Sequence, residues 1–331
     1  MSKETITKSC CQMENTEKDF SSLAKKLLMP ILLIVFVIFF SIQAKGSFLT
    51  WYNIKNILTQ SSYIIIAGVG LTFVIISGGI DLSIGYQMSL SGIITALLIV
   101  DHGFSMLSGI LVCVLIGMTL GLFNGTLCTK LKVNPLIITL SAAMIYQGIS
   151  YMISKSNTII GFPKSFLFIG QGYIGPVPFC IILAVVIVLI AIFILKKTYF
   201  GRYVFAIGGN EDAAKLSGVN TDKIKIIIYG ICGLCSAIAA IVLMSRSGAA
   251  NSSIGPGTEF TALSGCLLGG ITLTGGEGSI GGMVAGALII SILANGMQLM
   301  YLGVYPQYIA KGLVLIIAMA FDVYQKNKKR L

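Results

Sequence analysis

Charged side chains are scarce in this chain, and their scarcity excludes a water-soluble globular fold. Asp, Glu, Lys and Arg make up 11% of the 331 residues, whereas soluble proteins usually carry about a quarter. Apolar residues make up 56%, and the mean hydropathy is +0.92. A chain with so little polar surface is expected to place most of its length in a lipid bilayer.

The residues that catalytic and metal sites need are also nearly missing. His102 is the single histidine and follows Asp101 in a short polar connection. A membrane serine protease needs a histidine beside its nucleophile, and a metalloprotease needs several ligands. The sequence contains no G-x-x-x-x-G-K-[ST], so this chain is expected to bind no ATP itself. We therefore predict no enzyme activity, no metal site and no cofactor, with any ATP used by a separate subunit.

The eight cysteines do not resemble a secreted disulfide framework. Cys232 and Cys235 form a C-x-x-C within an apolar stretch, where two small apolar residues one turn apart are favoured over a redox pair. A signal peptide is not expected either. The apolar run 27–44 follows a polar tail, residues 1–26, and has no small-residue cleavage site, so it predicts an uncleaved first helix.

Long, continuous apolar runs such as 31–40 and 181–195 predict membrane-spanning helices. Backbone groups in hydrocarbon must be satisfied internally, and a barrel would show alternation instead. The sequence thus predicts an all-α, polytopic transmembrane helix bundle with about ten membrane segments, or eight to ten if some are re-entrant. The predicted segments are 27–44, 57–79, 86–100, 106–128, 136–154, 178–195, 226–246, 258–274, 279–300 and 308–321.

Lys and Arg are concentrated on one side of these segments. If the N-terminus is cytoplasmic, 17 of the 23 basic residues fall in inside loops and tails and four in outside loops. This bias predicts that both termini are cytoplasmic. It also accounts for the net charge of +11 without invoking nucleic acid. The chain divides into the tail 1–26, a membrane domain 27–321 and a basic tail 322–331.

The longest inside loop, residues 196–225, carries charges of both signs. Within it, Asn210–Asp212 is typical of a helix start and Gly218 of a helix stop. A short helix bearing Ala213 and Ala214 suits the docking of a partner protein. The alternative is that the segment only connects two helices.

Two glycine-rich motifs resemble each other. Gly78–Gly85 reads GGIDLSIG and Gly275–Gly281 reads GGEGSIG, and each pairs an acid with a serine. They indicate an internal repeat, or two broken helices that meet near a pathway. With 38 glycines in the chain, coincidence is the alternative, and close helix packing explains most of the other glycines.

Polar residues in or beside the apolar segments are candidates for a translocation path. Asp81 and Glu259 lie at segment edges, where burying a charge costs less, so neither predicts a proton or ion site. Each neutral candidate could instead form a hydrogen bond between helices. The candidates are Asp81, Ser83, Asn124, Asn134, Glu259 and Asn295.

These motifs together resemble the permeases of ribose-type sugar ABC importers, a family that includes galactose and xylose permeases. The similarity runs in family order from about residue 50 to residue 322. The matching stretches are SGGIDLSIGYQMSLSG (77–92), GLFNG (121–125), NPLIITL (134–140), FGRYVFAIGGNEDAAKLSGVNTDKIKIIIYGICGL (200–234), LLGGITLTGGEGSIGGMVAGALII (267–290), NGMQLM (295–300) and KGLVLIIAMAFD (311–322).

The resemblance implies a permease of the bacterial inner membrane that moves a pentose or hexose by alternating access. Its implied partners are a pair of cytoplasmic ATP-binding subunits, an extracytoplasmic sugar-binding protein and a second permease copy, identical or related. The family's ATPase-coupling loop corresponds here to Gly208, Gly209, Asn210, Glu211, Ala213, Ala214 and Gly218.

The chain also departs from the family pattern. Thr261 and Ser264, close to Glu259, stand where many members carry an alanine run, so the sugar is not determined. A permease of the same superfamily for a nucleoside, an amino acid or a sugar-like signal is the first alternative. An autonomous secondary carrier is the second, and the scarcity of acidic residues within the helices argues against it.

Overall fold

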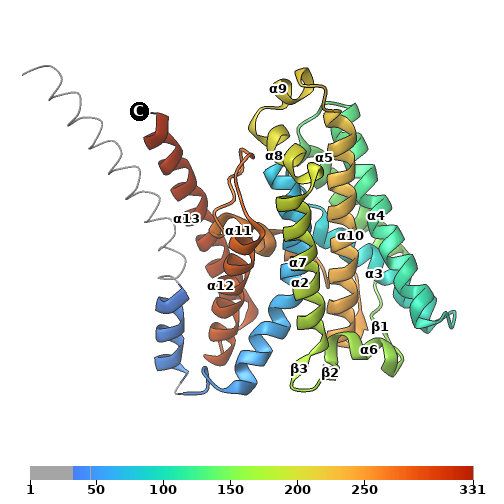
Figure 1. Cartoon of the computed structure of the whole chain (residues 1–331). Helices are drawn as coiled ribbons and strands as arrows, with labels where there is room; N and C mark the ends of the chain where they lie inside the picture. Colours follow the sequence, from blue (N-terminus) through green and yellow to red (C-terminus); the bar gives the residue numbers. More distant parts are fainter. Residues whose placement is uncertain (1–32, 45, 331) are drawn as a thin grey trace, which may run out of the picture.

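The computed structural model describes residues 33–44 and 46–330, which are mostly helical (Figure 1). The helices are the segment Leu33–Gln43, α2 (Trp51–Ile76), α3 (Ile84–Val100), α4 (Met106–Lys130), α5 (Pro135–Ser154), α6 (Lys164–Gln171), α7 (Phe179–Lys197), α8 (Tyr199–Gly209), α9 (Glu211–Leu216), α10 (Thr221–Ser247), α11 (Thr258–Leu268), α12 (Ile280–Leu299) and α13 (Val304–Arg330). Four short strands are β1 (Ile159–Ile160), β2 (Tyr173–Ile174), β3 (Val177–Pro178) and β4 (Ala249–Ala250).

Six helices are long and apolar enough to cross a membrane: α2, α4, α5, α7, α10 and α12. Each of the ten predicted segments contains a helix, but four helices are shorter than a full crossing or only partly apolar. The clearest case is α11, whose 11 residues reach about 16 Å, half the thickness of the hydrocarbon core. The polar tail 1–26 and the start of the first segment lie outside the described residues.

The bundle has buried central helices and exposed apolar helices around them. α2, α10 and α12 are mostly buried, and α10 packs against α2, α3 and α4. α4, α5 and α7 are largely exposed although they are strongly apolar. On α4, for example, Leu107, Leu111 and Leu115 form an exposed row at four-residue spacing. Such a surface fits lipid rather than water.

The opposite face of α4 carries glycines that bring it close to α10. Gly117, Gly121 and Gly125 all face α10, and a Cβ added to Gly233 would lie 3.0 Å from the Gly121 Cα atom. Small residues at four-residue spacing allow the backbones of membrane helices to touch. The close packing predicted from the glycine content is confirmed at this crossing.

The two ends of the bundle differ. One end carries α8, α9 and the last turns of α13, which continues through the predicted basic tail to Arg330 (Figure 1). The opposite end carries α6 and the hairpin of β2 and β3 (Figure 1). At that end β1 pairs antiparallel with β4, with Ile159 opposite Ala250.

Candidate functional site

Helices α8 and α9 form a structured protrusion at one end of the bundle, which we call the α8–α9 segment. Asn210 caps α9, because its Oδ1 atom accepts a hydrogen bond of 2.9 Å from the Ala213 N–H. Gly218 ends the turn with φ +85° and donates its N–H to the Lys215 carbonyl at 2.9 Å. The helix start and stop predicted from the sequence are confirmed.

Glu211 fastens α9 to α10. Its carboxylate lies 2.9 Å from the Lys215 Nζ atom and also pairs with Lys225 on α10, while Thr221 donates to it at 3.4 Å. Partial burial alone would raise the pKa of Glu211. The hydrogen bonds and charges of Lys225 and Lys215 outweigh burial and hold that pKa below its ordinary value. The carboxylate is therefore ionised at neutral pH, and the attachment is formed.

The outward face of α9 carries one large apolar side chain. Leu216 is 91% exposed, and its neighbours Asp212 and Ala213 are also exposed. Ala214 points inward and is buried. A leucine that contacts so little of its own chain, beside a small residue, is suited to contact another protein.

The end of α8 touches both glycine-rich motifs. A methyl group added to Gly208 would collide with the Ile76 carbonyl oxygen and the Gly276 nitrogen. The Gly276 N–H itself donates to the Ile76 carbonyl at 2.8 Å. A Cβ on Gly275 would lie 2.8 Å from the Gly78 nitrogen. The two motifs, far apart in sequence, thus meet at the end of α2, directly below the α8–α9 segment.

Five residues beyond the end of α2, Asp81 begins a buried network of hydrogen bonds. Ser83 donates to the Asp81 Oδ1 atom from its N–H at 2.9 Å and from its hydroxyl at 2.6 Å. Gln87 donates to Asp81 Oδ2 at 3.2 Å and to the Ser83 hydroxyl at 2.7 Å. Asn124 donates to the Ser83 hydroxyl at 2.8 Å, and the Tyr146 hydroxyl donates to Asn124 Oδ1 at 2.7 Å.

This network joins α3, α4 and α5 around an acid that forms no ion pair with any described side chain. Asp81 is 0% exposed, and both ion pairs among the described side chains belong to Glu211. The sequence placed Asp81 at a segment edge, whereas the structure buries it inside the bundle. Sequence reasoning missed Gln87 and Tyr146. Gln87 follows Ser83 by one helical turn, a spacing that could have indicated it; nothing in the sequence singles out Tyr146.

Glu259, the second acidic candidate, is also buried, at 1% exposed. Both of its oxygens accept from the Gly257 N–H at 3.0 Å. Its carboxylate lies against Gly85, so tightly that a methyl group there would clash. Glu259 therefore borders Gly85 in the first turn of α3, and Gly85 follows Asp81 by four residues. Thr261 and Ser264 are buried and donate to backbone carbonyls four residues earlier.

The remaining two candidates lie elsewhere. Asn295 on α12 forms a reciprocal pair with Asn53 on α2, with N···O distances of 2.9 and 3.0 Å. Asn134 is exposed and caps α5 by accepting from the Leu136 N–H at 3.0 Å. The structure thus brings Asp81, Ser83 and Asn124 together, and leaves these two asparagines outside that cluster.

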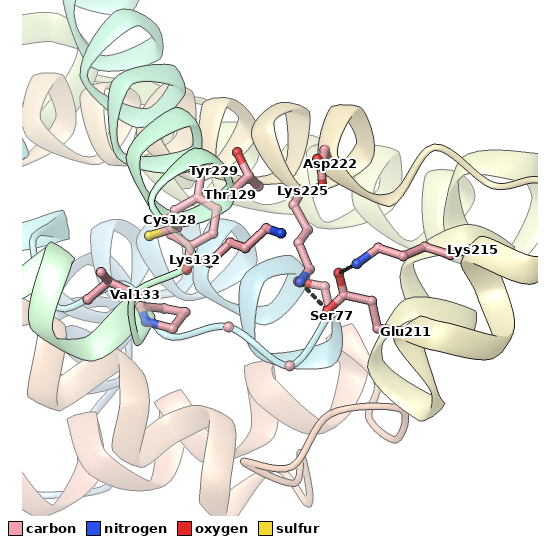
Figure 2. A pocket seen from close by; sticks show the side chains of 13 residues that line it. Ser77, Cys128, Thr129, Lys132, Val133, Glu211, Lys215, Asp222, Lys225 and Tyr229 are labelled. Carbon is pink, nitrogen blue, oxygen red and sulfur yellow. Dashed lines mark hydrogen bonds and ion pairs between the residues drawn. The ribbon is translucent and has the colours of Figure 1, made fainter.

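A pocket of about 340 Å³ lies beneath the α8–α9 segment. Its walls come from the end of α4, the first turns of α10, α9 and the loop after α2 (Figure 2). It is lined by Ser77, Gly78, Gly79, Cys128, Thr129, Lys132, Val133, Pro135, Glu211, Lys215, Asp222, Lys225 and Tyr229.

Groups suited to metal binding are not clustered in the described part of the chain, where no three His, Cys, Asp or Glu side chains could share an ion. Cys232 and Cys235 are free and buried in α10, as expected of small apolar residues.

Comparison with known proteins identifies the family. Residues 53–319 match the family described as the permease component of branched-chain amino acid transport systems. The ribose import permease protein RbsC of Haemophilus influenzae is 39% identical, covering 84% of this chain and 87% of that protein. RbsC of Bacillus subtilis is 38% identical, covering 94% and 97%.

The xylose transport system permease protein XylH of Haemophilus influenzae is 33% identical, covering 91% of this chain and 96% of that protein. No solved structure matches the chain. The resemblance to ribose-type permeases is confirmed. The chain belongs to this family of transport-system permeases and is a multi-pass membrane protein.

Proposed function

We propose that this chain is the permease subunit of an ATP-driven, binding-protein-dependent importer of a pentose or hexose. The observation that carries the proposal is the α8–α9 segment, which presents Leu216 outward, is fastened to α10 by Glu211 and touches both glycine-rich motifs. A partner that pushes on α9 would therefore move the ends of buried elements rather than a loose loop.

In this proposal, a pair of ATP-binding subunits docks on the coupling loop, Gly208–Gly218. Closure of that pair displaces α9, and Gly208 passes the displacement to the end of α2 and to Gly276. The loop from Ser77 to Ser83 follows directly, so the Asp81 network is the first polar cluster to be affected. Alternating access would then follow from rocking of packed helices rather than from local unfolding.

The proposal also includes an orientation of the chain in the membrane and a set of partner proteins. The end with α8 and α9, together with both termini, faces the cytoplasm, as the distribution of Lys and Arg favours. The end with α6 and the β2–β3 hairpin faces outward and receives the sugar-binding protein. Ten segments span or enter the bacterial inner membrane, and a second permease copy completes the transporter.

A sugar is favoured over an amino acid by the named relatives. The family description refers to branched-chain amino acids. The relatives that cover most of this chain are named for ribose, xylose and, in Escherichia coli at 36% identity, D-allose. An amino acid importer remains the second candidate because of the family description.

The test is co-purification of this chain with candidate ATP-binding subunits from membranes. Leu216→Glu should abolish recovery of the ATPase, because it places a charge at the centre of the docking face. It should leave folding intact, because Leu216 is 91% exposed. The matched control is Ile174→Glu, which alters an exposed apolar residue at the opposite end and should retain the ATPase.

Three outcomes distinguish docking through α9 from docking elsewhere and from an autonomous carrier. Loss of ATPase recovery in Leu216→Glu, but not in Ile174→Glu, supports the importer proposal and its coupling loop. Equal recovery with both variants would show that docking does not use α9. If the wild-type chain recovers no ATPase but transports sugar in liposomes, it is an autonomous carrier instead.

A further inference from the structure

The pocket beneath the α8–α9 segment carries an unbalanced positive charge. Its lining includes three lysines but only two carboxylates, Glu211 and Asp222. Glu211 pairs with Lys215 and Lys225. Among the side chains that the structure describes, Lys132 forms no ion pair, and Figure 2 shows it extending across the pocket toward Lys225. Two ammonium groups thus converge on one space, and an anion would neutralise the excess.

The hydroxyl groups in the pocket wall need donors rather than acceptors. Ser77 donates its proton to a backbone carbonyl at 2.8 Å, Thr129 at 2.9 Å and Tyr229 at 3.3 Å. With their protons used, these three oxygens can only accept hydrogen bonds from a ligand. A ligand that satisfies both the ammonium groups and these oxygens must combine an anionic group with hydroxyl donors.

We propose that this pocket is a binding site for a phosphate ester that carries hydroxyl groups. The phosphate lies between Lys132 and Lys225, and the ligand hydroxyls donate to Ser77, Thr129 and Tyr229. The volume of about 340 Å³ is at the small end of the range for ligand sites and suits a ligand the size of a pentose phosphate. The same chemistry occurs in a soluble sugar phosphate and in the headgroup of phosphatidylglycerol.

Binding at this site would act on the docking element. A phosphate between the two lysines competes with Glu211 for Lys225, and the Glu211–Lys225 pair is the ionic link that fastens α9 to α10. An occupied pocket would therefore loosen the α8–α9 segment. This makes the pocket a regulatory site, distinct from the path that the transported sugar follows, and its binding step needs no ATPase.

Binding is tested with the purified full chain in a neutral detergent, by calorimetric titration with D-ribose 5-phosphate. Lys132→Gln should weaken binding roughly tenfold, since it removes one charge-assisted contact. Glu211→Gln should strengthen binding, because the competing carboxylate is gone. The matched control is Lys130→Gln, two residues earlier on α4 and outside the pocket lining, which should bind like the wild type. D-Ribose without the phosphate should not bind.

A second arm identifies the source of the phosphate. The wild type and Lys132→Gln are compared in nanodiscs of phosphatidylglycerol and of phosphatidylcholine by thermal unfolding. A stabilisation by phosphatidylglycerol that depends on Lys132, without binding of D-ribose 5-phosphate, assigns the site to a lipid headgroup. Binding of D-ribose 5-phosphate alone assigns it to a soluble ligand.

Two results would overturn the proposal. One is the absence of Lys132-dependent binding in both arms. The other is an equal loss of binding in Lys130→Gln and Lys132→Gln, which would reduce the effect to general surface charge. Neither result would bear on docking of the ATPase at Leu216, so the two proposals fail separately.

Discussion

Several buried amide side chains in this protein connect neighbouring helices. The Asn53–Asn295 pair is the clearest example, because each amide both donates to and accepts from the other. Both side chains are buried between α2 and α12. An amide left without its partner there would have little water to turn to.

Replacing one member of this pair should lower the free energy of unfolding more than replacing both. Asn295→Leu removes the donor to the Asn53 Oδ1 atom, while the Asn53 amide N–H still donates to the Phe48 carbonyl. We expect a loss of about 1–2 kcal/mol in unfolding free energy in detergent. The double variant Asn53→Leu, Asn295→Leu should recover part of that loss. Denaturant unfolding of the four proteins in the cycle gives the coupling energy. Gln147→Leu, a change at a half-buried position outside this pair, serves as the control. Additive losses would mean that the pair contributes no net coupling.

Residue types alone predicted only part of the site. The sequence shows which polar residues fall near apolar segments, and so it supplied Asp81, Ser83 and Asn124. It does not show which face of a helix each occupies, or at what depth, because these depend on packing. Asn295 therefore ranked equally with Asn124, although it lies in a separate pair, and Tyr146 was missed because a tyrosine in an apolar run is ordinarily a packing residue.

Whole helices were predicted more reliably than the points at which a helix ends within an apolar run. Apolar runs located every long helix, because about 20 apolar residues suffice to identify a span. The segment 258–274 was predicted as one piece, but the helix ends at Leu268, and Gly270 adopts φ +78°. A glycine in an apolar run can either pack inside a helix, as Gly121 does, or end it. The sequence of the run does not distinguish the two, because the outcome depends on what lies against that glycine.

The contact between α8 and the end of α2 makes a prediction about two adjacent glycines. Gly208→Ala should reduce sugar uptake roughly tenfold, because its methyl group collides with backbone atoms of Ile76 and Gly276 and displaces the elements that move. Gly209→Ala is the control, since a methyl group there meets no atom within 4 Å. Uptake is measured in cells that express the complete transporter.

Recovery of the ATPase subunits should be unchanged in both variants, because a single methyl group at either position in the last turn of α8 leaves the exposed face around Leu216 unaltered. Uptake that falls equally in the two variants would mean that helix propensity matters rather than contact. Normal uptake in Gly208→Ala would exclude this junction as the route of coupling.

At the scale of the whole molecule, charge and apolarity together favour one orientation in the membrane. Apolar side chains form the exposed surface of α4, α5 and α7, while most Lys and Arg belong to the end that bears α9. The positions of apolar runs and of Lys and Arg along the sequence predicted this arrangement, since neither depends on details of packing. The pocket beneath α9 could not be predicted in the same way, because its lysines come from the loop after α4, from α9 and from α10, and only the fold brings them together.

Orientation can be tested by cysteine labelling with a membrane-impermeant maleimide. The labelling is done in a variant in which Cys10, Cys11 and Cys128 are replaced by serine. The five remaining cysteines are buried. Leu216→Cys should react in inverted vesicles and not in intact cells. Ile174→Cys, in the hairpin at the opposite end (Figure 1), should react in intact cells. This pattern is expected because the end with α9 carries the positive charges that are retained in the cytoplasm. The reverse pattern would place α9 outside, where no ATP-binding subunit could reach it, and the importer proposal would fail with it.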